Sequence, residues 1–336
     1  KVTEYIGTGP IKFVEWKPDV HIRMVRYDDY KPRAEAANGY GGREVTYVDE
    51  IRWTPMPEVA TRVASLESGE VDFADDLQAV AYERIKDNPK LRAIVVRPYA
   101  WAMGVFNKKD GLMTHVKLRQ AVQAAIDIEP VMRAAVGNPL FYRLDSALAF
   151  TEQSAWHSKA GGDAYNQRNK DKAKKLLQEA GYKGEPIRFL TTREYEWMYN
   201  VALVTKQQLE DVGMTVDLQV VDWATLVQRR NNEKMYDIFT TGMTLVPDPT
   251  QHPYLRCDWP GWTCDEAITS RMDAIRKEPD PAKRKALWEE VHRTFYERVP
   301  VIRYGDLFGL RAMQASVKGF NEKMAFPRFY NVWLEK

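Results

Sequence analysis

The chain has 336 residues, with 49 Lys and Arg against 47 Asp and Glu, so its formal net charge at pH 7 is +2. This near-balance argues against a dedicated nucleic-acid-binding protein, in which basic residues normally outnumber acidic ones. The hydrophobic content of 44% excludes wholesale disorder, and the length suffices for about two domains. Aromatic residues make up 12% of the chain, which indicates either a large core or a pocket lined by rings.

Strand and helix patterns alternate along the chain, which predicts an α/β fold. The clearest helix start is Asp280-Pro281, an N-cap followed by proline at the first helical position. Gly69 is a clear helix stop, and the strand after it completes a βαβ-like unit. We expect strands at 11–16, 20–27, 45–53, 71–73, 94–107, 187–191, 214–221, 236–241, 301–310 and 329–334, and helices at 58–68, 116–126 (ending before Pro130), 171–180, 197–212, 223–231 and 281–298.

Both cysteines lie in one short loop. Cys257 and Cys264 bracket a segment whose Pro-Gly turn can bring the two ends together. We expect a disulfide, which would stabilise the fold by about 2–3 kcal/mol and require an oxidising compartment; two free thiols are the alternative. A zinc site is poorly supported, because His252 is the nearest imidazole and no second cysteine pair exists.

The sequence carries no catalytic motif that we recognise. It contains no G-x-S-x-G, H-E-x-x-H, Walker loop or G-x-G-x-x-G. Its five histidines are scattered, and none has a partner at the spacing of a metal site. We therefore expect no catalytic residue, no metal and no cofactor.

Six phrases, in order along nearly the whole chain, resemble one family. They are Gly7-Thr8-Gly9-Pro10, Leu66-Glu67-Ser68-Gly69-Glu70-Val71-Asp72, Phe106-Asn107 followed by Val116 to Asp127, Asp171 to Tyr182, Gln208 to Trp223, and Asp248-Pro249. Together they resemble the extracellular solute-binding proteins of family 5, the dipeptide- and oligopeptide-binding components of ABC importers. Each phrase alone is a weak signal, and their common order makes the resemblance strong.

The resemblance implies a two-lobe fold like that of type II periplasmic binding proteins. Residues 1–106 and 308–336 would build lobe I, and residues 107–307 lobe II, with hinge strands crossing near Phe106 and Tyr304. The ligand would bind between lobes that close over it. Family members are longer, so the chain resembles their C-terminal portion. We expect a monomer that lies in the periplasm or otherwise outside the cytoplasm. Its expected partners are the permease subunits of an ABC importer.

The resemblance also implies a ligand site. Arg193 matches an arginine that pairs with the ligand carboxylate in dipeptide-binding relatives, a task suited to its planar fork. Tyr195 and Trp223 match pocket aromatics. Trp101 is expected as a further wall. Met243 and Leu245, near the end of the strand before Asp248-Pro249, complete the expected ligand-binding set.

One departure from the family pattern concerns the ligand's amine. Relatives place an aspartate for the α-ammonium where this chain has Leu245 or Val246. An apolar residue cannot compensate a buried ammonium. Our hypothesis is therefore a ligand with a carboxylate but no α-ammonium at the usual place: an acylated peptide, an opine-like conjugate or another organic acid. Asp248 could meet the amine from a shifted position, which keeps ordinary peptides open.

Two other functions are alternatives to ligand capture for import. One is a hydrolase acting on a small amide or sugar in the same cleft. The other is a lobe that serves only as a docking surface.

Overall fold

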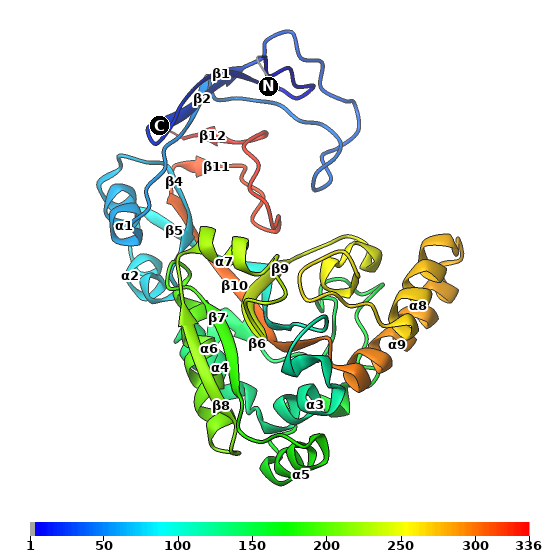
Figure 1. The fold of residues 1–336 in the computed structure, drawn as a ribbon. Coiled ribbons are helices and arrows are strands. Elements are labelled where there is room, and N and C mark those ends of the chain that lie inside the picture. The colour runs from blue at the N-terminus through cyan, green and yellow to red at the C-terminus, as the bar shows by residue number, and fades with distance from the viewer. Residues whose placement is uncertain (1–3, 336) are drawn as a thin grey trace. The chain divides into compact units, whose positions relative to one another are not determined.

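The computed structural model describes residues 4–335 and divides the chain into two compact units (Figure 1). Unit 1 contains the described chain up to Arg97 and from Gly309 onward, and unit 2 is Pro98–Phe308. The chain passes between them in two long strands, β5 (Leu91–Phe106) and β10 (Val301–Gln314). The first boundary falls inside β5, not at its end near residue 106, because Ala100–Phe106 already pair with a strand of unit 2.

Unit 1 is built mainly from antiparallel strands. A three-stranded sheet joins β1 (Ile11–Lys17), β2 (His21–Arg26) and β3 (Glu50–Trp53). The helix α1 (Val59–Ser68) ends at Gly69, whose φ of 79° is left-handed. The remaining elements of unit 1 are β4 (Phe73–Leu77), α2 (Tyr82–Lys86), and the pair β11 (Val317–Lys318) and β12 (Trp333–Leu334).

The predicted βαβ-like unit is wrong. β3 pairs with β2, whereas β4 pairs antiparallel with the end of β10, so the strands before and after α1 lie in different sheets. The reason is that β4 takes its partner from a strand more than 200 residues further along the chain. Such a long-range partner leaves no mark in the local strand and helix pattern.

Unit 2 is organised around a mixed sheet in the order β10-β5-β9-β7-β8, with β6 (Tyr142–Arg143) paired to β10. β7 (Pro186–Thr191) runs parallel to both β8 (Thr215–Val220) and β9 (Ile238–Thr244). Three neighbouring strands therefore end at the same edge of the sheet. The helices of unit 2 are α3 (Val116–Ala125), α4 (Ile128–Val136), α5 (Lys170–Ala180), α6 (Glu196–Glu210), α7 (Trp223–Arg229), α8 (Glu266–Lys277) and α9 (Pro281–Arg298).

Capping residues explain where several helices begin. The Asp280 carboxylate accepts hydrogen bonds from the backbone N–H groups of Ala282 and Lys283, so α9 begins at the predicted proline. The sequence pattern missed α4 and α8. Asp127 caps α4, and Pro130 lies in its first turn, where a missing N–H costs no helical hydrogen bond.

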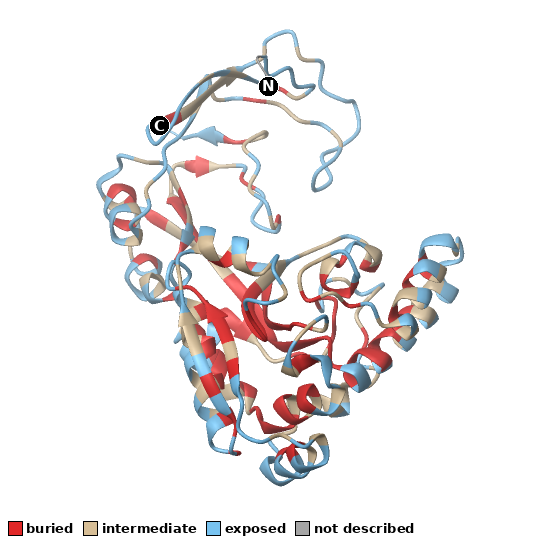
Figure 2. Ribbon diagram, in the orientation of Figure 1, coloured by how far each residue is buried: buried red, intermediate tan, exposed pale blue. Residues whose placement is uncertain are grey.

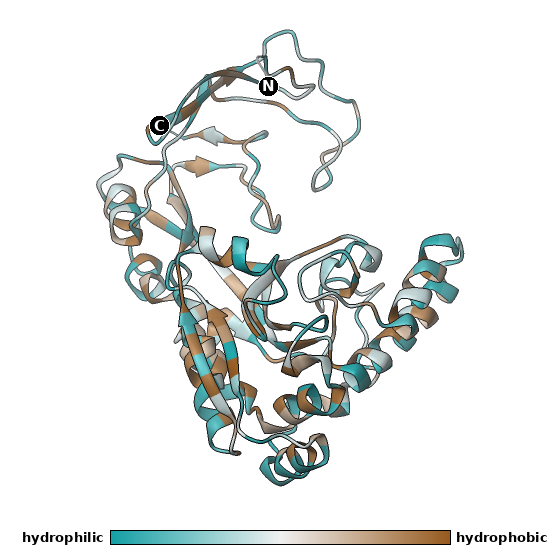
Figure 3. Cartoon of the chain, viewed as in Figure 1, coloured by the Kyte–Doolittle hydropathy of each residue, from teal (hydrophilic) through white to brown (hydrophobic). Residues whose placement is uncertain are grey.

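Apolar side chains pack on both faces of the sheet in unit 2. Neighbouring residues of β9 point to opposite faces, since Ile238 packs with residues of α3, α4 and α6 whereas Phe239 packs with residues of α8 and α9. Buried residues accordingly follow the strands (Figure 2), and the flanking helices carry distinct hydrophilic and hydrophobic stripes (Figure 3). None of the helices within residues 4–335 has the length and apolarity to cross a membrane.

Candidate functional site

The carboxyl ends of β7, β8 and β9 define the candidate site, which lies entirely in unit 2. We call the segments that follow these strands, 192–195, 221–223 and 245–248, the carboxyl edge. In α/β sheets, ligands bind outside the carboxyl ends of parallel strands, because loops and helix starts converge there. Arg193 and Tyr195 come from the first segment, Trp223 from the second and Leu245 from the third.

Tyr195 and Trp223 meet at this edge. Their ring centroids lie 5.1 Å apart and their planes are inclined by 80°, an edge-to-face contact. The Glu194 carboxylate also accepts a hydrogen bond of 3.1 Å from the backbone N–H of Trp223. Tyr195 remains 40% exposed. The structure therefore brings two of the predicted site residues together and keeps part of their ring surface free.

Arg193 lies two residues before Tyr195 in the same segment and is exposed. Its Nη2 donates a 2.7 Å hydrogen bond to the Tyr199 hydroxyl, and its Cζ lies 4.4 Å from the centroid of the same ring. The other guanidinium nitrogens make no hydrogen bond within residues 4–335. Tyr199 thus orients Arg193 while most of its donors stay available.

The remaining expected residues differ in exposure. Trp101 is only 1% exposed; it packs edge to face against Tyr254, with Arg303 over its ring at 4.6 Å. Met243 is paired with Trp101 across β5 and β9, and like Leu245 it is only partly buried at the border of the same apolar cluster. Trp101 has almost no surface to offer a ligand, so we leave it out of the site proposed below.

Asp248 is already compensated by its neighbours. One carboxylate oxygen accepts hydrogen bonds from the Thr250 N–H and hydroxyl, at 2.9 and 2.6 Å, and the other accepts one from Arg284. Burial opposes ionisation of this carboxyl, but the bonds from Thr250 and Arg284 outweigh it and lower the pKa of Asp248. An incoming ammonium would have to compete with Arg284 for this carboxylate.

The cysteine loop contributes further rings next to β9. Cys257 and Cys264 form a disulfide, and the loop between them carries Trp259, which lies 6.0 Å from the Phe239 ring. Sequence reasoning missed Trp259 as a neighbour of the site, and it missed Arg230, whose Cζ lies 5.7 Å from the Trp259 ring. No local pattern marks either residue, because their proximity depends on how the loop folds back onto the sheet.

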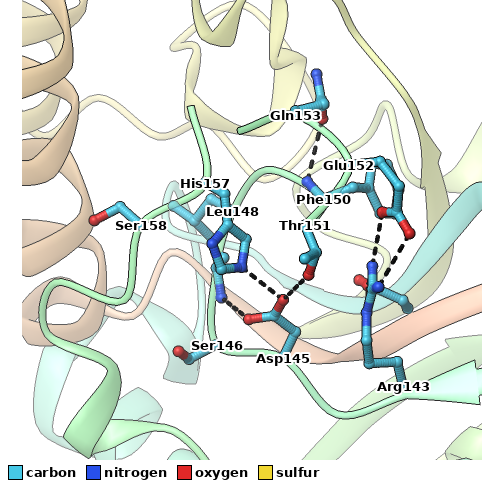
Figure 4. A network of polar contacts seen from close by, with 12 residues as sticks. Arg143, Asp145, Ser146, Leu148, Phe150, Thr151, Glu152, Gln153, His157 and Ser158 are labelled. Carbon is cyan, nitrogen blue, oxygen red and sulfur yellow. Dashed lines mark hydrogen bonds and ion pairs between the residues drawn. The ribbon is translucent and has the colours of Figure 1, made fainter. Parts of the chain in front are cut away.

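The polar network around Asp145 shows how one of the histidines is used (Figure 4). The Asp145 carboxylate accepts hydrogen bonds from His157 Nε2 at 2.8 Å, from the Thr151 hydroxyl at 3.0 Å and from the Ala147 N–H at 2.9 Å. No serine or cysteine side chain in residues 4–335 hydrogen-bonds to His157. The network ties together the segment from residue 145 to 157 and has no nucleophile in place for hydrolysis.

Two other histidines lie deep in unit 2. His252 and His292 are 3% and 0% exposed, and burial lowers the pKa of each to about 3. They are therefore neutral at ordinary pH and lie away from solvent. Within the part of the chain that the structure describes, no three His, Cys, Asp or Glu residues are grouped so as to hold a metal ion.

The fold is that of the type II periplasmic binding proteins. The chain belongs to the bacterial extracellular solute-binding proteins of family 5, whose model (middle region) matches residues 1–261. This membership confirms the family that the ordered phrases predicted, and the observed fold confirms the α/β class that the alternation of strand and helix patterns predicted.

Individual relatives agree with this assignment. The probable peptide ABC transporter periplasmic-binding protein y4tO of Sinorhizobium fredii is 29% identical over 91% of this chain and 60% of its own length. The substrate-binding protein CtaP of Listeria monocytogenes superposes with a TM-score of 0.82 at 19% identity, over 98% of this chain and 67% of that one. AgaA of A. tumefaciens R10, solved with agropinic acid, gives a TM-score of 0.80 at 23% identity and the same coverage. The chain spans about 45–60% of the length of the first curated relatives it matches.

Proposed function

We propose that this chain is part of a solute-binding protein that captures a peptide-like or carboxylate-bearing small molecule and delivers it to the permease subunits of an ABC importer. Family membership supports this function, and the y4tO relative is named as a probable peptide-binding component of such a transporter. The protein would act as a monomer in the periplasm or another extracytoplasmic space, where an oxidising environment suits the disulfide.

The observation that carries the proposed site is the contact between the Tyr195 and Trp223 rings at the carboxyl edge, where Arg193 lies two residues before Tyr195 in the same segment. A guanidinium beside half-exposed rings offers charge-assisted hydrogen bonds to a carboxylate and an apolar surface to the group next to it. Met243 and Leu245 would line the third side.

We further propose that the ligand lacks a free α-ammonium at the usual family position. Leu245 and Val246 are apolar there, and the Asp248 carboxylate already accepts hydrogen bonds from Thr250 and Arg284. An unpaired ammonium would lose its hydration at this place without gaining a counter-charge. AgaA, whose structure holds agropinic acid, is an example of a fold relative that binds an organic acid.

The test is a calorimetric titration of the protein with L-alanyl-L-phenylalanine and with its N-acetyl form. We expect the acetylated peptide to bind at least about tenfold more tightly, since only the free peptide brings an uncompensated charge. Tighter binding of the free dipeptide would overturn the proposal for the amine. Native mass spectrometry of protein purified without denaturation would in addition reveal any ligand retained from the cell.

The hydrolase alternative gains no support. The family consists of solute-binding proteins. Asp145, the partner of His157, is engaged by Thr151 and Ala147, and no serine or cysteine side chain of residues 4–335 hydrogen-bonds to the His157 ring. Incubation of the protein with N-acetyl-alanyl-phenylalanine, followed by mass spectrometry, should return the peptide intact.

A further inference from the structure

Arg230, just after α7, carries a guanidinium among three aromatic rings. Its Cζ lies 5.7 Å from the ring centroid of Trp223, 5.7 Å from that of Trp259 and 5.9 Å from that of Phe239. Its Nε is buried and has no hydrogen-bond partner. The side chain makes no hydrogen bond or ion pair with any residue in 4–335, and its two Nη nitrogens are not among the buried unpaired atoms.

The lack of any hydrogen bond from its side chain to residues 4–335 distinguishes Arg230 from other arginines whose Nε is buried. Among the described residues, Arg62 and Arg284 also have a buried Nε without a hydrogen-bond partner, but each donates hydrogen bonds through another nitrogen. Arg230 alone in this group has only rings around it. Burial lowers the pKa of Arg230, which reflects the loss of hydration of its charge. The surrounding rings compensate part of that loss, and an anion would compensate the rest.

The free donors of Arg230 lie next to the proposed ligand site. Trp223 contacts both the Arg230 guanidinium and the Tyr195 ring, so these three side chains form a continuous group within unit 2. Arg193 lies two residues before Tyr195 in the same segment of the carboxyl edge. Arg230 thus contacts Trp223 of this ring pair, and Arg193 precedes Tyr195 in the chain and contacts Tyr199. Neither guanidinium has a carboxylate partner in the described chain.

We propose that Arg230 binds a second acidic group of the ligand, so that the ligand class is a small molecule with two carboxylates, one for Arg193 and one for Arg230. This inference rests on the proposed function, because it assumes that the carboxyl edge holds the ligand. The planar guanidinium of an arginine donates two parallel N–H hydrogen bonds to a carboxylate, and desolvation by the surrounding rings strengthens such a pair.

The test uses two probes that differ in one charged group, N-acetyl-alanyl-glutamate and N-acetyl-alanyl-glutamine. Their affinities are measured by calorimetry for the unmodified protein and for Arg230→Gln, Arg230→Lys and Arg229→Gln. Arg229 is the matched control, because it removes the same charge one position earlier, and it makes no contact of the kind seen for Arg230 within residues 4–335. Thermal melting of each variant checks that it remains folded.

We expect the unmodified protein and Arg229→Gln to bind the glutamate probe at least tenfold more tightly than the glutamine probe. Arg230→Gln should reduce this preference to less than twofold, and Arg230→Lys should retain part of it. A merely structural Arg230, which holds Trp223 and Trp259 together, would lower the melting temperature or both affinities alike and leave the preference unchanged; that result would overturn the inference.

The failure of this inference is distinguishable from the failure of the proposed function. Equal, tight binding of both probes by the unmodified protein would overturn the role of Arg230 while leaving carboxylate capture in place. Binding of neither probe would overturn both proposals.

Discussion

Tyr195 and Trp223 hold their rings edge to face, with centroids 5.1 Å apart, although they follow two different strands of the sheet in unit 2. Tyr195 is the N-cap residue of α6, and Trp223 is the first residue of α7. Both rings are therefore attached to helix starts and not to long loops. Such an aromatic surface is preorganised, so little conformational entropy is lost when a ligand contacts it.

The first prediction concerns this surface. Trp223→Ala should weaken the binding of N-acetyl-alanyl-phenylalanine by about tenfold, because a large apolar contact of the ligand is lost. Calorimetry measures the change. Trp333→Ala is the control, since that tryptophan belongs to unit 1 and is 47% exposed. If the two variants bound the peptide equally well, Trp223 would not belong to the site.

The second prediction concerns the carboxylate anchor. Arg193→Ala should cost more than about 1.5 kcal/mol of binding free energy for the same peptide, as expected for a charge-assisted hydrogen bond. Tyr199→Phe removes the hydroxyl that accepts from Arg193 but keeps the ring beneath it. This variant should therefore lose only about threefold in affinity, through poorer orientation of the guanidinium. An unchanged affinity of Arg193→Ala would remove this arginine from the site.

The third prediction concerns the disulfide between Cys257 and Cys264. Replacing both cysteines with serine should lower the free energy of unfolding by about 2–3 kcal/mol, because the unfolded chain gains loop entropy. Urea unfolding with and without a reducing agent measures this difference. Reduction should destabilise the unmodified protein by a similar amount and leave the double variant unaffected. Identical unfolding curves for the oxidised protein and the double variant would contradict the prediction.

The fourth prediction concerns acid stability. The pKa values of His252 and His292 are lowered by burial to about 3 in the folded protein, from about 6.5 in the unfolded chain. Between these values the unfolded chain binds more protons, so the free energy of unfolding must fall as the pH falls from about 6.5 towards 3. Each histidine contributes a slope of up to about 1.4 kcal/mol per pH unit.

A variant of a buried histidine and a variant of an exposed histidine test this slope. In the unmodified protein the backbone N–H of Leu148 donates a 3.1 Å hydrogen bond to His292 Nε2. His292→Gln keeps an acceptor for this N–H and removes one titrating group. Urea unfolding at pH 4.5, 5.5 and 6.5 should show a slope lower by about 1 kcal/mol per pH unit for this variant. His115→Gln, at an exposed position, should behave like the unmodified protein. A slope unaffected by His292→Gln would refute the role of its buried imidazole.

Local chemistry made several elements predictable. The N-cap and proline at Asp280-Pro281 mark the start of α9, because this signal lies at the helix itself. The strand β8 follows from the period-two alternation of Val216, Leu218 and Val220. The family was also readable from ordered phrases, and the α/β fold class from the alternation of strand and helix patterns. The resemblance supplied Arg193, Tyr195 and Trp223 as site residues, and their role in ligand binding stays a prediction.

Tertiary structure decided the features that depend on distant partners. β4 joins β10 and not β3, and nearly all of the largest fully buried side chains are aromatic. Trp101, expected to line a pocket, is buried among them. The sequence by itself therefore determined the family, the α/β class and the helices and strands with strong local signals. Only the folded chain decided which rings stay accessible, and that Arg230 contacts rings but no acidic side chain among residues 4–335. The reason is that burial and charge pairing arise from contacts between residues far apart in the sequence.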